Sequence, residues 1–260
     1  MTAKVQRNLG LIGTSAKGQN ARQSGIADFT AQRLYQKTSP SVDVYGYQGR
    51  VAHSTHSSTS VSSTISLGTA YSNREIYIIV ATMSAAGGGF NQIPVSGVTV
   101  GSQSFTSLYQ TTQTTESNAC AIAFYRYVDS GSLGTSASYT VTFNNEQVHS
   151  GIMAFTTGPT ATANVGTFGA SSATTSWGSG GTISTDQGGF VLFSSIAQNS
   201  SAPSGTYVTG YINGIGFDAG SNEYVVLAHQ GDVGSGTVTV PQPNYTPAGD
   251  NAFAAISRGE

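Results

Sequence analysis

The side chains best suited to chemistry in this chain are one cysteine and four histidines. Cys120 is the only thiol, and the histidines are His53, His56, His149 and His229. A cysteine with a distant histidine forms the nucleophile and base of several hydrolase classes. Two histidines three residues apart suit metal ligation on a helix. The chemistry to consider is therefore thiol catalysis or a metal site.

The sequence around these residues argues against both. Cys120 lies in the alternating run NACAIAFYRYV, where it shares one face with Ile122 and Phe124. We therefore interpret it as a small buried hydrophobic residue in a strand. His53 and His56 fall in a Ser/Thr-rich, strand-like segment with no nearby carboxylate or second cysteine to complete a metal site. A trimer axis that gathers three copies of one histidine around a metal stays open.

Motifs that mark other enzymes are missing. The sequence contains no Gly-X-Ser-X-Gly nucleophile elbow and no Gly-rich phosphate loop. The segment GIGFDAG (214–220) lacks the spacing of a dinucleotide loop, and we interpret it as a turn. The acids of the body are scattered and form no calcium loop. We predict no enzymatic activity, no cofactor and no metal, although a distant carboxylate pair of the glycosidase type stays open.

The composition favours strands and a neutral surface. Only 8% of the residues are charged, against about 25% in ordinary globular domains. Thirteen Tyr and eleven Phe, with many Val, Ile and Thr, favour β-strands. The sequence contains no run of eighteen apolar residues, so it predicts no membrane span. Its N-terminal residues lack the long apolar core of a secretory signal, so such a signal is not expected. A lone cysteine is typical of a chain made in a reducing cytoplasm.

Charge is distributed unequally along the chain. Residues 1–50 carry seven basic and two acidic residues, a net charge of +5, whereas residues 51–260 carry three basic and ten acidic residues, a net charge of −7. This asymmetry predicts an arm that docks on an acidic partner, with a solvated tail as the alternative. So few charges, without interleaved aromatic residues, favour a protein over nucleic acid. The predicted docking residues are Lys4, Arg7, Lys17, Arg22, Arg33 and Lys37.

The order of segments predicts an arm followed by strands. Residues 1–45 are predicted to be an extended basic anchoring arm with one short helix over 24–37. Residues 46–63 are predicted to be an exposed strand or a linker. From residue 64 a period of two prevails, and REIYIIVATM (74–83) predicts a central strand buried on both faces. The segment 97–111 predicts a bent strand or a hairpin that turns at Gly101.

The body divides into two halves whose motifs recur in the same order. We predict a first β half over 46–157, a Gly/Ser/Thr-rich connector over 158–181 that could contain one strand, and a second β half over 182–260. The triplet TIS recurs at 64 and 182, a Ser-Asn pair before an alternating run at 117 and 221, and TVT at 140 and 237. This alignment places Tyr224 at the position of Cys120, and Gln230 at that of Arg126.

Regularly spaced strands without a helical pattern predict an all-β protein. The expected body is a β-sandwich or a jelly-roll-like fold, with two pseudo-repeated halves. Two small sandwiches in tandem are the competing arrangement.

Three segments together resemble a loose pattern in β-sandwich virion structural proteins of tailed bacteriophages. They are EIYIIVATMSA, AIAFYRYVDSGSLGTSASYTVTF and SGIMAFTT, within residues 64–157, with a fainter echo over 182–257. The chain lacks the aromatic Tyr-Arg ending of that pattern after SGIMAF. The resemblance implies a head decoration, fibre or tail component that is located in the virion and contacts other virion proteins. A homo-oligomer such as a trimer is expected.

Two other functions stay open. Exposed aromatic side chains could stack on host-surface glycans in a phage tail receptor module, and the candidates are Trp177, Tyr207 and Tyr211, with Tyr245 as a further one. The competing interpretation is that Trp177 anchors the connector in a groove. The second alternative is the jelly-roll coat protein of a small icosahedral virus, whose arm would carry more charge than this one.

Overall fold

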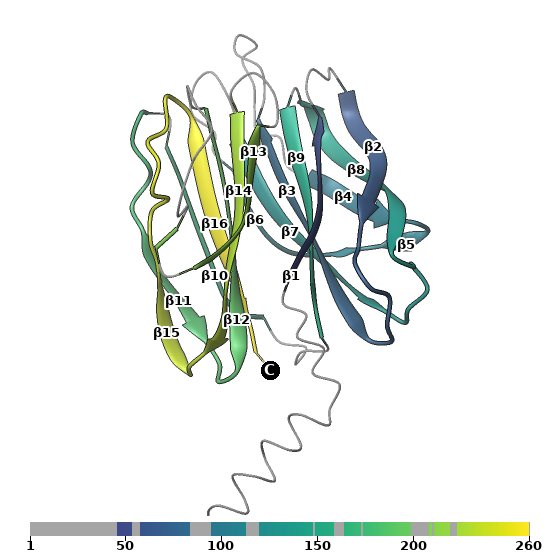
Figure 1. Cartoon of the computed structure of the whole chain (residues 1–260). Coiled ribbons are helices and arrows are strands. Elements are labelled where there is room, and N and C mark those ends of the chain that lie inside the picture. Colours follow the sequence, from purple (N-terminus) through teal and green to yellow (C-terminus); the bar gives the residue numbers. More distant parts are fainter. Residues whose placement is uncertain are drawn as a thin grey trace, which may run out of the picture. The chain divides into compact units, whose positions relative to one another are not determined.

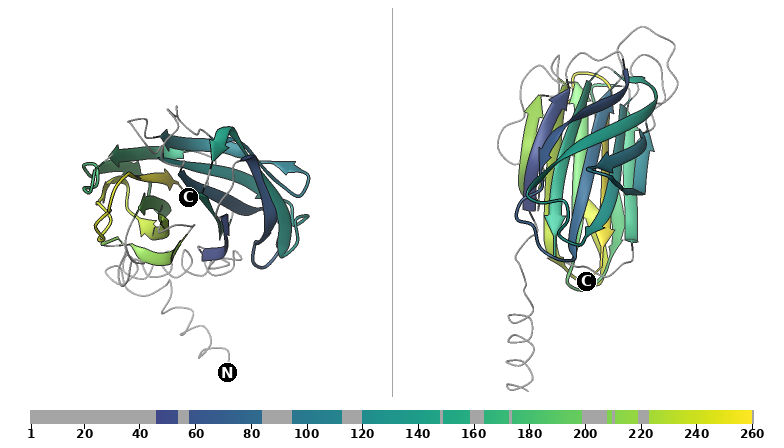
Figure 2. Two further views of the ribbon diagram at one scale, coloured as in Figure 1. Left: turned by 90° about the horizontal axis from the view of Figure 1, so that it is seen from above. Right: turned by 90° about the vertical axis from the view of Figure 1, so that its right-hand side faces the viewer.

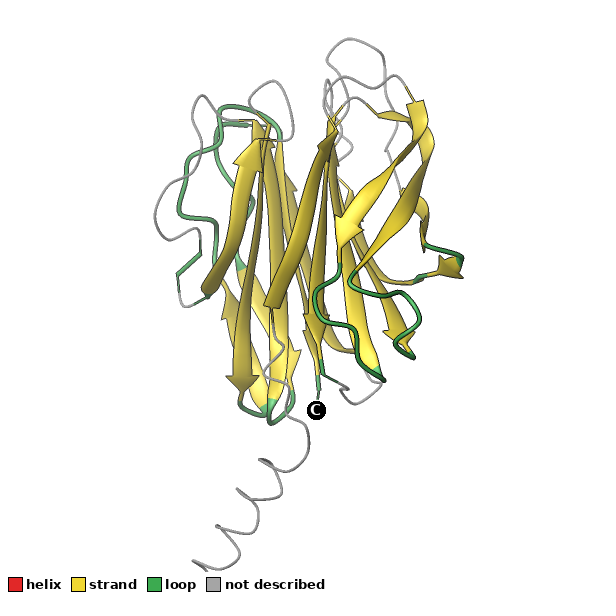
Figure 3. Cartoon of the chain, turned by 45° about the vertical axis from the view of Figure 1, so that its right-hand side comes forward, coloured by secondary structure: helices red, strands yellow, loops and turns green. Residues whose placement is uncertain are grey.

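The computed structural model describes residues 46–53, 58–83, 95–112, 120–147, 149–158, 164–172, 174–198, 208–209, 211–218 and 223–259. Every regular element in these ranges is a β-strand (Figure 1 and Figure 3). The predicted all-β class is therefore confirmed. The predicted arm, with its helix and all six of its basic docking residues, lies outside the described residues.

The first half of the body forms two antiparallel sheets. Sheet A has the strand order β1-β9-β3-β7-β6, and sheet B has the order β2-β8-β4-β5. The strands are β1 (Gly46–His53), β2 (Ser58–Ser66), β3 (Arg74–Met83), β4 (Val95–Val100), β5 (Gln103–Ser104), β6 (Thr106–Thr112), β7 (Cys120–Asp129), β8 (Ser136–Gln147) and β9 (His149–Thr157). Strands β4 and β5 form the predicted hairpin, which turns at Gly101 with a φ of 59° that favours glycine.

The second half forms sheet C, with the order β10-β16-β12-β14-β13, and the two-stranded sheet D of β11 and β15. Its strands are β10 (Asn164–Ser172), β11 (Gly181–Thr185), β12 (Gly189–Gln198), β13 (Ile212–Asp218), β14 (Glu223–Val233), β15 (Gly236–Val240) and β16 (Asn251–Arg258). Strand β10 lies within the segment predicted as a connector. The turn predicted at 214–220 is wrong, because β13 occupies most of it.

Sheets A and C repeat one strand order. Strands β1, β9, β3, β7 and β6 occupy the same places in sheet A as β10, β16, β12, β14 and β13 occupy in sheet C. The pair β2-β8 of sheet B corresponds in the same way to β11-β15 of sheet D. The hairpin β4-β5 has no counterpart among the described residues. The strand order thus shows the two pseudo-repeated halves that the sequence motifs predicted.

The four sheets stack as layers in the order B, A, C, D (Figure 2). One core lies between B and A, a second between A and C, and a third between C and D. Sheets A and C are therefore covered on both faces, which explains why every residue of β3, β9 and β16 is buried. Such strands read as continuous apolar runs rather than as alternating ones. The β-sandwich character and the doubly buried strand over 74–83 are confirmed.

We call the contact between sheets A and C the seam. Across the seam the strands face one another in reverse order: β1 by β13, β9 by β14, β3 by β12, β7 by β16 and β6 by β10. A reversed order is what a two-fold axis through the contact of β3 with β12 would produce. Glycine permits the close approach of β10 to β6, because a Cβ on Gly169 would lie 2.5 Å from the Tyr109 hydroxyl. The chain therefore folds as an internal pseudo-dimer.

Candidate functional site

The body buries most of the charge whose position is described. Among the charged side chains with a described burial, only Arg50 and Asp186 are exposed. Arg126 is half-buried, and the others are buried: Arg74, Glu75, Asp129, Glu223, Asp250 and Arg258. Four of the five acids of residues 51–260 whose burial is described lie in the interior. Two of these, Glu75 and Asp129, form ion pairs with arginines of neighbouring strands.

Cys120 lies in the apolar core of the seam beside Ile122 and Phe124, with none of its surface exposed. Burial raises the pKa of its thiol, and the nearby carboxylates of Asp250 and Glu223 raise it further. A thiol must lose its proton to act as a nucleophile. The structure confirms the prediction that Cys120 is a buried strand residue.

We expect Cys120 to react with a maleimide only when the protein unfolds. Substitution Cys120→Val should change the free energy of unfolding by less than about 1.5 kcal/mol, because the two side chains are similar in volume. Mass spectrometry of the labelled protein, with and without denaturant, tests the first point, and urea unfolding tests the second. Rapid complete labelling of the folded protein would contradict the burial of this thiol.

The alignment of the two halves on their Ser-Asn pairs matched residues that lie on opposite faces of their strands. Val225 and Leu227 of β14 face the seam, as Cys120 and Ile122 of β7 do. By strand alternation Tyr224 then lies on the opposite face, so it does not correspond to Cys120. A shift of one residue moves every side chain of a strand to its other face. The motif repeat was therefore correct in order but wrong in register.

A charged cluster closes the end of the seam at which β3 begins. Arg126 donates two hydrogen bonds to Glu75, with its Nε 2.8 Å from Oε2. The Tyr77 hydroxyl donates to the same carboxylate. Arg258 reaches over from the second half, with its Nη2 3.9 Å from Glu75 Oε2 and its Nε donating to the Tyr77 oxygen at 3.2 Å. The cluster thus joins the two halves by charge as well as by packing.

The protonation states in this cluster follow from its hydrogen bonds. The hydrogen bond to Glu75 is the largest of the effects that raise the pKa of Arg126, so its guanidinium stays charged. Burial, followed by the Glu75 carboxylate, raises the pKa of Tyr77 well above its ordinary value, so its hydroxyl remains a donor. Arg126 lies near the end of β7 and is half-buried. Its partner is Glu75 of the neighbouring strand.

The histidines are dispersed rather than gathered. His149 Nε2 lies 3.4 Å from Glu223 Oε2 across the seam, and His53 contacts the Tyr139 hydroxyl on the other side of sheet A. His229 packs on Phe155, where burial lowers the pKa of the imidazole. The remaining histidine, at position 56, lies outside the described residues. Within the described ranges, no three His, Cys, Asp or Glu side chains are grouped as a metal site requires.

A buried ion pair organises the loops beside β3. Arg74 Nη2 donates to Asp129 Oδ2 at 2.6 Å and to the Gly134 carbonyl at 2.8 Å. Its Nη1 donates to three further carbonyls, those of Leu67, Gly68 and Thr69. One guanidinium therefore fixes the loops on both sides of the ion pair.

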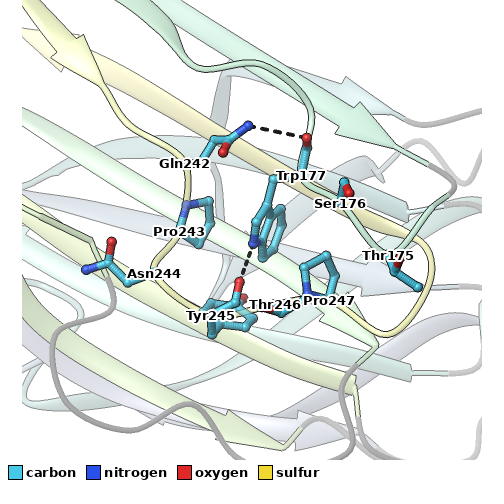
Figure 4. A pocket seen from close by; sticks show the side chains of 9 residues that line it. All are labelled: Thr175, Ser176, Trp177, Gln242, Pro243, Asn244, Tyr245, Thr246 and Pro247. Carbon is cyan, nitrogen blue, oxygen red and sulfur yellow. Dashed lines mark hydrogen bonds between the residues drawn. The ribbon is translucent and has the colours of Figure 1, made fainter.

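A neutral depression of about 310 Å³ lies at the end of sheet D (Figure 4). It is lined by residues 175–177 and 242–247. The Trp177 indole donates to the Tyr245 carbonyl at 2.5 Å, and the Gln242 amide donates to the Gly178 carbonyl at 2.8 Å. These bonds tie the segment before β11 to the segment after β15.

The predicted glycan-contacting aromatics lie mainly in the core. Trp177 is 9% exposed and Tyr211 is 7% exposed, and both belong to the core between sheets C and D. The Trp177 ring contacts Tyr245 edge-on and packs on Phe253. Tyr207 lies outside the described residues. Stacking on a sugar would need an exposed ring face, and the Trp177 and Tyr211 rings are packed against protein instead.

Sequence reasoning missed a polar surface on the outer side of sheet B, which we call the hydroxyl face. Its members are Ser60, Ser62, Thr64, Ser96, Thr99, Ser138, Thr140 and Thr142, on strands β2, β4 and β8. Thr140 is half-buried, and the other seven are exposed. The alternation of Ser or Thr with Val, Ile or Tyr in these strands was the available signal.

No protein-family model and no curated protein matches this chain. Among the described residues, no helix is long and apolar enough to cross a membrane.

Proposed function

We propose that this chain is a non-enzymatic structural protein of a tailed-bacteriophage virion, anchored to the particle by its basic N-terminal arm. It would serve as a head decoration, a fibre or a tail component, assembled as a homo-oligomer. The observation that carries the proposal is the separation of charge. All three lysines of the chain lie in residues 1–45, whereas the described body buries most of its charged side chains and pairs Arg74 with Asp129 and Arg126 with Glu75.

This separation suits an anchored building block. A charged segment steers and orients docking on a surface of opposite sign. Where its burial is described, the body exposes little charge, so those surfaces can lie beside other copies with little electrostatic repulsion. The Cys120 thiol is buried, and the Asp129 and Glu75 carboxylates are held in ion pairs with Arg74 and Arg126.

Deletion of residues 1–45 is expected to leave a soluble, folded body that no longer joins the particle. The body keeps its three cores without the arm, so its circular dichroism should remain that of a β protein. Co-sedimentation with particles assembled in its absence measures incorporation. A full-length variant in which the six basic arm residues are replaced by Gln is the matched control, and it should also fail to incorporate. Normal incorporation of the truncated body would overturn the anchoring role.

A further inference from the structure

We propose that the hydroxyl face of sheet B binds an uncharged polysaccharide. Three features carry this assignment. They are the fixed positions of the hydroxyls, the lack of charged and large hydrophobic side chains on the face, and its enlargement relative to the corresponding face of the second half.

The hydroxyls are held in rows by their own hydrogen bonds. Ser62 bonds to Thr140 at 2.8 Å, and Ser96 donates to Thr142 at 3.1 Å. Thr99 lies beside Thr140 in the register and donates to its carbonyl. Rows across strands repeat at about 4.8 Å, and positions along a strand at about 6.8 Å. Such a surface loses little side-chain freedom when it binds, which favours association.

The face excludes partners that are charged or hydrophobic. Strand β2, strand β4 and residues 136–143 of β8 contain no charged residue. A charged partner would lose hydration there without meeting an opposite charge. An apolar partner would find no apolar patch, because Val128 is the single large hydrophobic residue that is exposed in the described part of the chain and it lies on sheet A.

Hydroxyl groups both donate and accept hydrogen bonds. An uncharged polysaccharide presents repeated hydroxyls of the same dual character, and it therefore matches the face in charge and in bonding. Contacts of this kind are weak singly, since each hydrogen bond between neutral groups replaces hydrogen bonds that both groups made to water. Many copies on one particle would add their contacts through avidity.

The first half enlarges this face, and the second half does not. Sheet D carries only four such outward side chains, in the cross-strand pairs Thr182 with Thr239 and Ser184 with Thr237. The hairpin β4-β5 widens sheet B and is fixed to sheet A by the Tyr125 hydroxyl, which donates to the Val95 carbonyl at 2.9 Å. Sheet D is therefore a control surface within the same molecule.

The test uses the full-length chain coupled to beads through the lysines of its arm, which leaves the lysine-free body unmodified. The probes are fluorescent dextran, mannan and galactan, with alginate as an acidic comparator. We expect the neutral polymers to be retained equally at low and high salt. A Ser62→Ala/Thr99→Ala/Thr140→Ala variant should bind at least about tenfold more weakly. The control Thr182→Ala/Ser184→Ala/Thr239→Ala should bind within about twofold of the original chain.

Several results would overturn the assignment. They are retention of none of the three neutral polymers, retention of alginate alone, and an equal loss in the sheet D control. Concentration-dependent self-association that disappears only in the sheet B variant would instead make the face a contact between copies. Circular dichroism of both triple variants tests whether they fold. The single variant Thr140→Ser, which keeps the hydroxyl, should bind the neutral polymers as the original chain does.

Discussion

Replacement of Arg74 by Met is expected to lower the free energy of unfolding by about 3–5 kcal/mol, the usual cost of breaking a buried ion pair. The variant leaves the Asp129 carboxylate without its guanidinium inside the protein. It also removes the donor to the carbonyls of Leu67, Gly68, Thr69 and Gly134. Urea unfolding, followed by the fluorescence of the single tryptophan, measures the loss.

A matched control and a double variant make this expectation specific. Arg50→Met removes an exposed arginine from β1 and should cost less than about 1 kcal/mol. Arg74→Met combined with Asp129→Leu should recover part of the loss, because no lone charge then remains buried. A loss for Arg74→Met no larger than that for Arg50→Met would show that the ion pair does not support the fold.

The same ion pair predicts the sign of a pH effect. Burial alone would raise the pKa of Asp129, but hydrogen bonds from Arg74, Leu133 and Ser132, with the charge of Arg74, lower it overall. A carboxylate with a lowered pKa in the folded state stabilises the fold above its unfolded value of about 3.9. That stabilisation is lost as the pH falls through the folded pKa. Arg74→Met should therefore flatten the dependence of stability on pH below about 4.

Replacement of Glu75 by Ala is expected to have an effect of similar size, again about 3–5 kcal/mol. The variant leaves Arg126 and Arg258 at the end of the seam without the carboxylate that they share. Arg258→Met should cost less than Glu75→Ala, because Arg126 keeps its two hydrogen bonds to Glu75. Urea unfolding of both variants gives the order of the two effects.

Hydrogen exchange locates the effect of Glu75→Ala. Amides of β3, β7 and β16 should lose the most protection, because these strands carry the cluster. Asp186→Asn, which alters an exposed acid before β12, is the control and should change little. Equal stability of Glu75→Ala and the original chain would mean that apolar packing alone holds the seam.

Local pattern was sufficient to predict strands but not their partners. The unbroken apolar run at 74–83 required cover on both faces, and the four-layer stack supplies it. By contrast, Arg258 and Tyr77, which are joined by a hydrogen bond, are 181 positions apart in the chain. Nothing in the local sequence selects such a pair, because the folding of both halves creates it.

In the candidate sites, too, local pattern predicted some features, and others depended on distant parts of the chain. Burial of Cys120 followed from alternation, since its neighbours on one face are apolar. The burial of Trp177 was one of two interpretations that its Ser- and Gly-rich surroundings left open, and its contact with residues 242–247, from a distant part of the chain, supports the anchored one. The register of the second half was misread for a related reason. Identical dipeptides before two strands do not fix which side chains turn inward.

The pseudo-two-fold seam affects how stable the central core is at very low protein concentration. Two separate subunits joined by such a face would come apart as their concentration falls, because dimer stability depends on it. Here the chain itself links the two sheets and keeps each at an effective concentration on the order of millimolar around the other. A single copy far from any other molecule therefore keeps its central core closed.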